Sequence, residues 1–137
     1  KRVLLEMSYC CGSKPNFMSG AVYLNKARKF IELNFDRDIS VSQVAEASGV
    51  NRSYLCSLFS GRYGCGIKAY INNKRLDKSC FLLKNSKQSI TEIAFAVGYN
   101  SRQEFGYNFE KRYQMSPLQY RREAERAYSA EIKSVFL

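Results

Sequence analysis

The chain contains one sequence pattern twice, about fifty residues apart. In each copy a serine is followed three positions later by Gln or Glu, and then come an aliphatic–Ala pair, a glycine and two large apolar residues four apart. The first copy contains Ser40, Gln43, Val44, Ala45, Gly49, Leu55 and Phe59, and the second contains Ser89, Glu92, Ile93, Ala94, Gly98, Phe105 and Phe109. The offset is 49 residues up to the glycine and 50 residues after it. This duplication predicts two similar units that differ by one residue in a turn.

Each copy has the features of a helix-turn-helix. Ser40 with Gln43, and Ser89 with Glu92, predict capping boxes at the start of a first helix, because side chain and backbone can cap each other reciprocally at this spacing. Asn51 and Ser101 are suitable N-caps for a second helix, and Glu104 predicts a further box at Ser101. Gly49 and Gly98 lie where a tight turn needs an unrestricted backbone. We therefore predict helix-turn-helix units at 40–63 and 89–112.

The remaining segments also predict helices. Apolar residues at helical spacing predict an amphipathic helix over 20–35. Residues 67–84 lack Gly and Pro and predict a linker helix with Ala69, Leu76, Cys80 and Leu83 on one stripe. Ser116 followed by Pro117 predicts a final helix to about Arg126, since Pro is favoured at the first helical position. No β-type alternation is sustained, so we expect an all-α fold of about seven helices, with residues 127–137 as a C-terminal tail.

Composition restricts the class of protein. Hydrophobic residues make up 45% of the 137, which is enough for a packed core, and no apolar run is long enough to span a membrane or to form a signal peptide. We expect a cytosolic protein. The net charge of +10 suits a polyanionic partner and by itself would equally suit a membrane surface. Its distribution is uneven, since residues 65–88 carry six basic side chains against one acidic.

Metal and cofactor sites are not expected. The five cysteines contain no CxxC pair and the chain has no histidine, so the usual zinc ligand sets are unavailable. Buried free thiols are the expected state of the cysteines. No catalytic residues, cofactor or metal are predicted.

The outward face of each second helix follows by subtraction of its inward residues, Leu55 and Phe59 or Phe105 and Phe109. That face contains Arg52, Ser53, Cys56 and Ser57 in the first unit, and Arg102, Gln103, Gly106 and Tyr107 in the second. A helix braced in this way fits the major groove of DNA, where every base pair presents a distinct pattern of donors and acceptors. Two such helices in a short, basic chain indicate DNA binding.

With these two units and the helices around them, the chain resembles the AraC/XylS family of bacterial transcription regulators over about residues 22–122. In the second half the matching residues are Lys74–Leu76, Ser79, Leu83, Ile90, Ile93–Ala94, Val97–Tyr99, Ser101, Phe105, Phe109–Arg112, Ser116–Pro117 and Tyr120–Arg121. In the first half they are Val44–Ala45, Ser48–Asn51, Tyr54–Leu55, Leu58–Phe59 and Gly64.

The resemblance implies a seven-helix DNA-binding domain, here residues 21–126, whose recognition helices enter successive major-groove segments on one face of the duplex. Half-sites would then lie about 34 Å apart, one helical turn. Members are mostly transcription activators that bind promoters near RNA polymerase. Many are dimers with an N-terminal sensing domain for a small molecule such as a sugar, and residues 1–20 resemble the end of such a domain plus a linker. No membrane partner is implied.

Carried over position by position, the base-contacting residues would be Arg52, Ser53, Cys56, Ser57, Arg102, Gln103 and Tyr107. Arg102 suits guanine and Gln103 suits adenine, because each can bond in bidentate fashion to that base. Some relatives carry Arg in place of Ser57 and Tyr107, which puts the target sequence in question. The phosphate-contacting residues would be Arg62, Lys68, Ser101 and Lys111.

Two rival functions are less consistent with the sequence. A DNA-repair methyltransferase with an AraC-like module would need a zinc-ligating cysteine cluster, which Cys10 and Cys11 do not supply. An RNA-binding role is disfavoured because the deep, narrow major groove of A-form RNA excludes such a helix. Protein docking stays open as an additional role.

Overall fold

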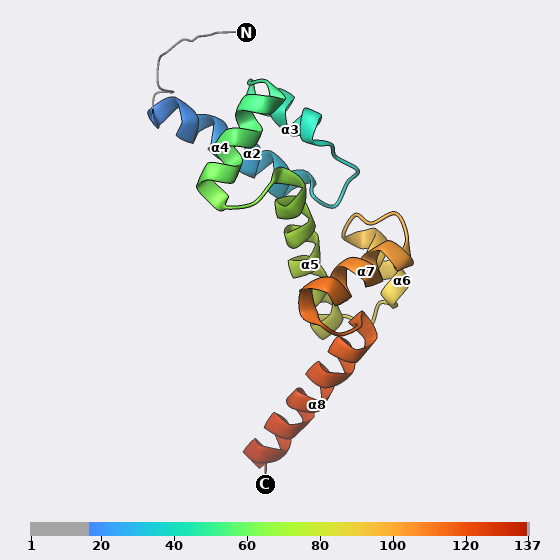
Figure 1. Ribbon diagram of the computed structural model, residues 1–137. Helices are drawn as coiled ribbons and strands as arrows, with labels where there is room; N and C mark the ends of the chain where they lie inside the picture. The colour runs from blue at the N-terminus through green and yellow to red at the C-terminus, as the bar shows by residue number, and fades with distance from the viewer. Residues whose placement is uncertain (1–16, 137) are drawn as a thin grey trace. The chain divides into compact units, whose positions relative to one another are not determined.

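The computed structural model describes residues 17–136, and these form seven α-helices without a strand (Figure 1). The predicted all-α fold is therefore confirmed. In chain order the helices are α2 Phe17–Asn34, α3 Val41–Ser48, α4 Arg52–Tyr63, α5 Ile67–Asn85, α6 Ile90–Ala96, α7 Arg102–Tyr113 and α8 Pro117–Phe136.

The helices belong to two compact units. Among the described residues, the first unit contains Phe17–Asn34 and Ile39–Ile71, and the second contains Phe35–Asp38 and Asn72–Phe136. The chain thus leaves the first unit between α2 and α3, returns four residues later, and leaves again within α5. The second unit, which contains the second helix-turn-helix, therefore includes a short segment from the first half of the sequence.

The core of the first unit consists of apolar residues spaced three or four apart along each helix. They are Leu24, Ala27 and Ile31 of α2, Val41, Val44 and Ala45 of α3, Leu55 and Phe59 of α4, and Ile67 and Ile71 of α5. Helix α2 packs on both α3 and α4. The spacing produces a continuous apolar stripe on each helix, and burial of these stripes holds the unit together.

The core of the second unit repeats this arrangement. Its buried residues are Leu76, Leu83, Ile90, Ile93, Ala94, Val97, Tyr99, Phe105 and Phe109. Phe109 contacts the rings of Tyr113 and Tyr120 at centroid distances of 4.6 and 5.4 Å. In the first unit Phe59 contacts Tyr63 and Tyr70 at 4.6 and 5.0 Å. The fifty-residue sequence repeat is thus a repeat of core packing.

Two predictions about helices were wrong in detail. Ala69 is exposed, because the early part of α5 buries Ile67 and Ile71 instead, and only the later part follows the predicted stripe at Leu76 and Leu83. Helix α8 continues ten residues past Arg126. Residues 127–136 contain no Gly or Pro that would end a helix, and Ala127, Ala130 and Glu131 favour its continuation.

Candidate nucleic-acid interface

The first helix-turn-helix begins with the predicted capping box. The Gln43 amide donates to Ser40 Oγ at 3.2 Å, and the Ser40 amide donates to Gln43 Oε1 at 2.8 Å. Helix α3 ends at Gly49, whose φ of 82° is left-handed and whose amide donates to the Ala45 carbonyl. Asn51 then caps α4 by accepting from the Tyr54 amide at 2.8 Å. The starts of α3 and α4 are therefore fixed by the predicted cap hydrogen bonds, and the turn between them contains the glycine that the sequence places there.

The second helix-turn-helix begins in the same way at Ser89. The Glu92 amide donates to Ser89 Oγ at 3.1 Å, and the Ser89 amide donates to Glu92 Oε1 at 2.9 Å. Hydrogen bonding of the Glu92 carboxylate to the Ser89 backbone amide, and then to the Ser89 side chain, favours the ionised form and lowers the pKa of Glu92. Ser101 caps α7 by accepting from the Glu104 amide at 3.1 Å. The predicted further box is wrong, however, because Glu104 Oε1 accepts from the Asn100 amide at 3.3 Å instead of the Ser101 amide.

The turns of the two units differ by one residue, as predicted. One residue, Val50, separates Gly49 from the cap Asn51, whereas two residues, Tyr99 and Asn100, separate Gly98 from the cap Ser101. Tyr99 follows Gly98 as Val50 follows Gly49, and it is only 4% exposed, so the second turn buries a large aromatic side chain in the core. Burial raises the pKa of the Tyr99 hydroxyl to about 12.

Helix α4 exposes the predicted base-facing residues over a buried apolar side. Leu55 and Phe59 are fully buried. Arg52, Ser53 and Ser57 are exposed and Cys56 is half-buried. Cys65 and Cys80 are half-buried free thiols like Cys56, and Cys10 and Cys11 lie outside the described residues. The face that α4 turns to solvent is polar and carries one positive charge at its N-terminal end.

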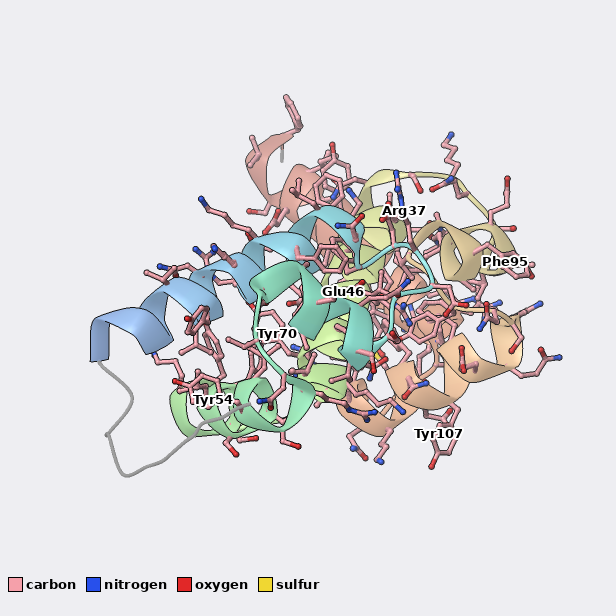
Figure 2. The ribbon with its side chains drawn as sticks, turned by 90° about the horizontal axis from the view of Figure 1, so that it is seen from above. Arg37, Glu46, Tyr54, Tyr70, Phe95 and Tyr107 are labelled. Atoms are coloured by element: carbon pink, nitrogen blue, oxygen red, sulfur yellow. The ribbon has the colours of Figure 1, made fainter. Side chains whose placement is uncertain are left out.

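Helix α7 has the same division. Phe105 and Phe109 are fully buried, while Arg102 and Gln103 are exposed in the first turn. Tyr107 is 68% exposed, and Figure 2 shows its ring projecting away from the helix. A large aromatic side chain held in solvent, one helical turn beyond Gln103, widens the surface that α7 can present to a ligand.

The predicted phosphate-contacting residues lie around these helices. Arg62 near the end of α4, Lys68 in the first turn of α5 and Lys111 near the end of α7 are exposed. The guanidinium of Arg62 lies 5.5 Å from the centroid of the Tyr63 ring. Ser101 is half-buried, and its hydroxyl oxygen already accepts the cap hydrogen bond.

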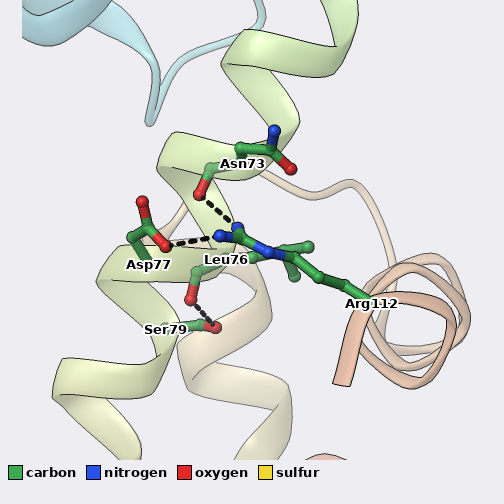
Figure 3. A network of polar contacts seen from close by, with 5 residues as sticks. All are labelled: Asn73, Leu76, Asp77, Ser79 and Arg112. Atoms are coloured by element: carbon green, nitrogen blue, oxygen red, sulfur yellow. Dashed lines mark hydrogen bonds and ion pairs between the residues drawn. The ribbon is translucent and has the colours of Figure 1, made fainter. Parts of the chain in front are cut away.

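Sequence reasoning missed a set of polar contacts that hold the second helix-turn-helix to α5. The guanidinium of Arg112 on α7 donates to the Asn73 carbonyl at 3.0 Å and lies 3.1 Å from Asp77 Oδ1 (Figure 3). Within α5, Ser79 Oγ donates to the Leu76 carbonyl at 2.6 Å. Arg112 lies within the motif that resembles the family, but the sequence assigns it no role. When an arginine donates to a backbone carbonyl, the sequence does not show which residue is the acceptor, because every residue has a carbonyl.

Between residues 17 and 136 no helix has the length and apolarity to cross a membrane. In the same part of the chain, no three His, Cys, Asp or Glu side chains gather as metal ligands would.

Comparison with known proteins places these two units among bacterial regulators. Residues 23–123 match the family model described as a helix-turn-helix domain. The Msm operon regulatory protein of Streptococcus mutans is 32% identical over 107 residues, which cover 78% of this chain and 38% of that protein. The lactose operon transcription activator of Staphylococcus xylosus is 33% identical over 98 residues, which cover 72% of this chain and 35% of that protein. The chain thus spans little more than a third of either curated relative.

Solved structures give the same result for the fold. The C-terminal domain of AraT, a response regulator from Geobacillus stearothermophilus, is similar with a TM-score of 0.72 and 31% identity, over 74% of this chain and 84% of that one. A transcriptional regulator from Chromobacterium violaceum, described with AraC-type DNA-binding domain-containing proteins, has a TM-score of 0.71 and 25% identity, over 78% of this chain and 96% of that one.

Proposed function

Because this chain belongs to the AraC-type helix-turn-helix family, we propose that it is a sequence-specific DNA-binding module of a transcription regulator. The proposal rests chiefly on one observation, the duplication of an exposed polar helix face over a buried aromatic side. Arg52 begins α4 and Arg102 begins α7, so both candidate recognition helices carry a guanidinium in their first turn. The net charge of +10 adds attraction to the phosphate backbone.

The two recognition helices read successive major-groove segments in this proposal. Arg102 donates to guanine and Gln103 pairs with adenine, while Tyr107 contacts the neighbouring base or sugar. In the first unit Arg52, Ser53, Cys56 and Ser57 face the bases. The phosphate contacts come from Arg62, Lys68, Ser101 and Lys111, and they fix the position of the protein without reading sequence.

The parent protein is proposed to act as an activator that contacts RNA polymerase at a promoter. The name of the Staphylococcus xylosus relative, a transcription activator, supports this role. A small-molecule effector would act through a domain outside this chain, and the full-length protein would be a dimer. The relatives are transcription regulators, so we propose no enzymatic activity for the chain.

A mobility-shift assay with variants of half-site spacing tests whether both recognition helices bind the same DNA at once. A selected duplex with two half-sites one turn apart is compared with the same duplex carrying a five-base-pair insertion, which rotates one half-site to the opposite face of the DNA. We expect the insertion to weaken binding to the level of a single half-site, and we expect affinity to fall as salt rises. Equal affinity for both duplexes would refute simultaneous binding by the two recognition helices. Equal affinity for the selected duplex and for a duplex of random sequence would refute sequence-specific binding.

A further inference from the structure

The second unit, which contains the second helix-turn-helix, also includes the four residues Phe35–Asp38 from the loop between α2 and α3. Arg75 of α5 holds this segment. Its Nε donates to the Phe35 carbonyl at 2.7 Å, and its Nη2 donates to the Arg37 carbonyl at 2.9 Å. The planar guanidinium thus bonds two carbonyls of one short segment, a geometry that a lysine ammonium cannot reproduce.

The same guanidinium also contacts the turn between α6 and α7. Its central carbon lies 5.6 Å from the centroid of the Tyr99 ring. Gly98 lies so close that a Cβ built there would be 2.9 Å from Arg75 Nε and 2.8 Å from the Phe35 carbonyl oxygen. The turn, the arginine and the Phe35–Asp38 segment are therefore packed without spare room. Any displacement of Arg75 opens space directly beneath the turn that leads into α7.

A second contact from α5 reaches the same turn and α7. The Tyr99 hydroxyl donates to Asn72 Oδ1, and Asn72 Nδ2 donates to Asn108 Oδ1 at 3.4 Å. Asn72 and Arg75 lie three residues apart on α5, so they occupy neighbouring positions on one side of the helix. Together they connect α5 to Tyr99, two residues before the α7 cap, and to Asn108 in the middle of α7.

The first helix-turn-helix is supported differently. At the 49-residue offset the counterparts of Arg75 and Asn72 are Lys26 and Tyr23 on α2. Lys26 is exposed, and Tyr23 makes an edge-to-face contact with the Tyr54 ring of α4 at 6.2 Å. Within the described residues, the turn of the first unit therefore has no arginine that holds it as Arg75 holds the turn of the second unit. The contacts of Arg75 with its turn thus distinguish the second unit from the first.

From this geometry we propose that Arg75 is a positioning residue for α7. It fixes the α6–α7 turn through Tyr99, Gly98 and the Phe35–Asp38 segment, and so sets the angle at which Arg102, Gln103 and Tyr107 meet the bases. The proposal rests on the proposed function of α7 as a recognition helix. It makes base discrimination by the second unit depend on a side chain that touches no DNA.

The test compares Arg75→Gln with Lys78→Gln, which removes the same charge from an exposed position one turn further along α5. Binding is measured to a selected duplex and to duplexes substituted in one half-site at a time. The unaltered protein is expected to prefer the matched base pair by about tenfold in each half-site. Arg75→Gln is expected to reduce the preference at the α7 half-site to below about threefold and to leave the α4 half-site unchanged. Lys78→Gln is expected to preserve both preferences.

A readout without DNA accompanies the binding measurements. Amide hydrogen exchange at Tyr99, Asn100 and Ser101 is expected to accelerate in Arg75→Gln, while exchange at Val50 and Asn51 stays as in the unaltered protein. If Arg75→Gln does not fold, Arg75→Lys keeps the charge but loses the paired carbonyl bonds, and it is expected to show the same half-site asymmetry.

Two results would overturn the proposal. One is an equal loss of affinity for matched and substituted duplexes, because a smaller folded fraction lowers both alike. The other is unchanged exchange at the α6–α7 turn. If the unaltered protein discriminates at neither half-site, the proposed function fails instead, and the exchange measurement still decides whether Arg75 positions the turn.

Discussion

Replacement of Gly98 by alanine should destabilise the protein far more than the same replacement at Gly49. Both glycines have a positive φ, 109° and 82°, so each substitution places an L-residue in a strained backbone conformation that costs about 1–2 kcal/mol. At Gly49 a new Cβ meets nothing within 4 Å. The expected cost of Gly49→Ala is therefore the backbone strain alone.

At Gly98 a second cost is added. A Cβ there would lie 2.8 Å from the Phe35 carbonyl oxygen, 2.9 Å from Arg75 Nε and 3.1 Å from the Asp36 carbonyl carbon. Phe35 O and Arg75 Nε are the two atoms of one 2.7 Å hydrogen bond, so making room separates them. A hydrogen bond to a charged group contributes about 1.5–3 kcal/mol. We therefore expect Gly98→Ala to cost about 1.5–3 kcal/mol more than Gly49→Ala in the free energy of unfolding.

Urea unfolding followed by circular dichroism measures both costs. The combination Gly98→Ala with Arg75→Gln closes a double-mutant cycle. If the clash acts through the Arg75 hydrogen bond, the penalty of Gly98→Ala shrinks in the Arg75→Gln background. Equal losses for the two glycine variants, or a Gly98→Ala penalty independent of Arg75, would refute the reasoning.

Three further predictions concern single side chains. Arg102→Ala should cost about 1–3 kcal/mol on a selected duplex and relax preference at one base pair in a binding assay, whereas an equal loss on random DNA would mean that Arg102 contacts only phosphate. Burial raises the pKa of Tyr99 to about 12, so the stability that depends on its neutral form is complete below pH about 10 and is lost as pH rises toward 12. The urea midpoint should fall less steeply over that range in Tyr99→Phe, and an unchanged slope would contradict this. Asn51→Ala should lower the free energy of unfolding by about 0.5–2 kcal/mol and Asn51→Gly by only a few tenths, because glycine tolerates the cap position; similar losses in thermal melts would argue against the cap.

Local signals in the sequence predicted the helix boundaries well. Ser40, Ser89, Asn51 and Ser101 cap helices as expected, because a cap depends only on residues within one turn. Gly49 adopts the left-handed conformation that a turn after a short helix requires. The buried aromatic positions followed from spacing alone. These features share one property, namely that cause and effect lie within a few residues of each other.

The missed features depend on partners far away in the sequence. Arg75 bonds carbonyls 38 and 40 residues upstream, and since every residue has a carbonyl, no pattern marks the partner. Ala69 was placed on the apolar stripe because its spacing from Leu76 fits a helix, but Ile67 and Ile71 bury a different side there. The Glu104 carboxylate can accept from the amide of Asn100 or from that of Ser101, and sequence spacing does not show which of the two it uses. The base and phosphate contacts stay predictions until DNA binding is measured.

The excursion of Phe35–Asp38 has a consequence for engineering and for evolution. A gene cut between Ile71 and Asn72 does not separate two independent halves, because the downstream half lacks the tetrapeptide that Arg75 and Gly98 enclose. A chimera that borrows its second reader from a relative should therefore also borrow that upstream tetrapeptide. If the two units arose by tandem duplication, the dependence of the second unit on a loop from the first half of the chain would make the two copies inseparable. They would then be inherited and lost as a pair.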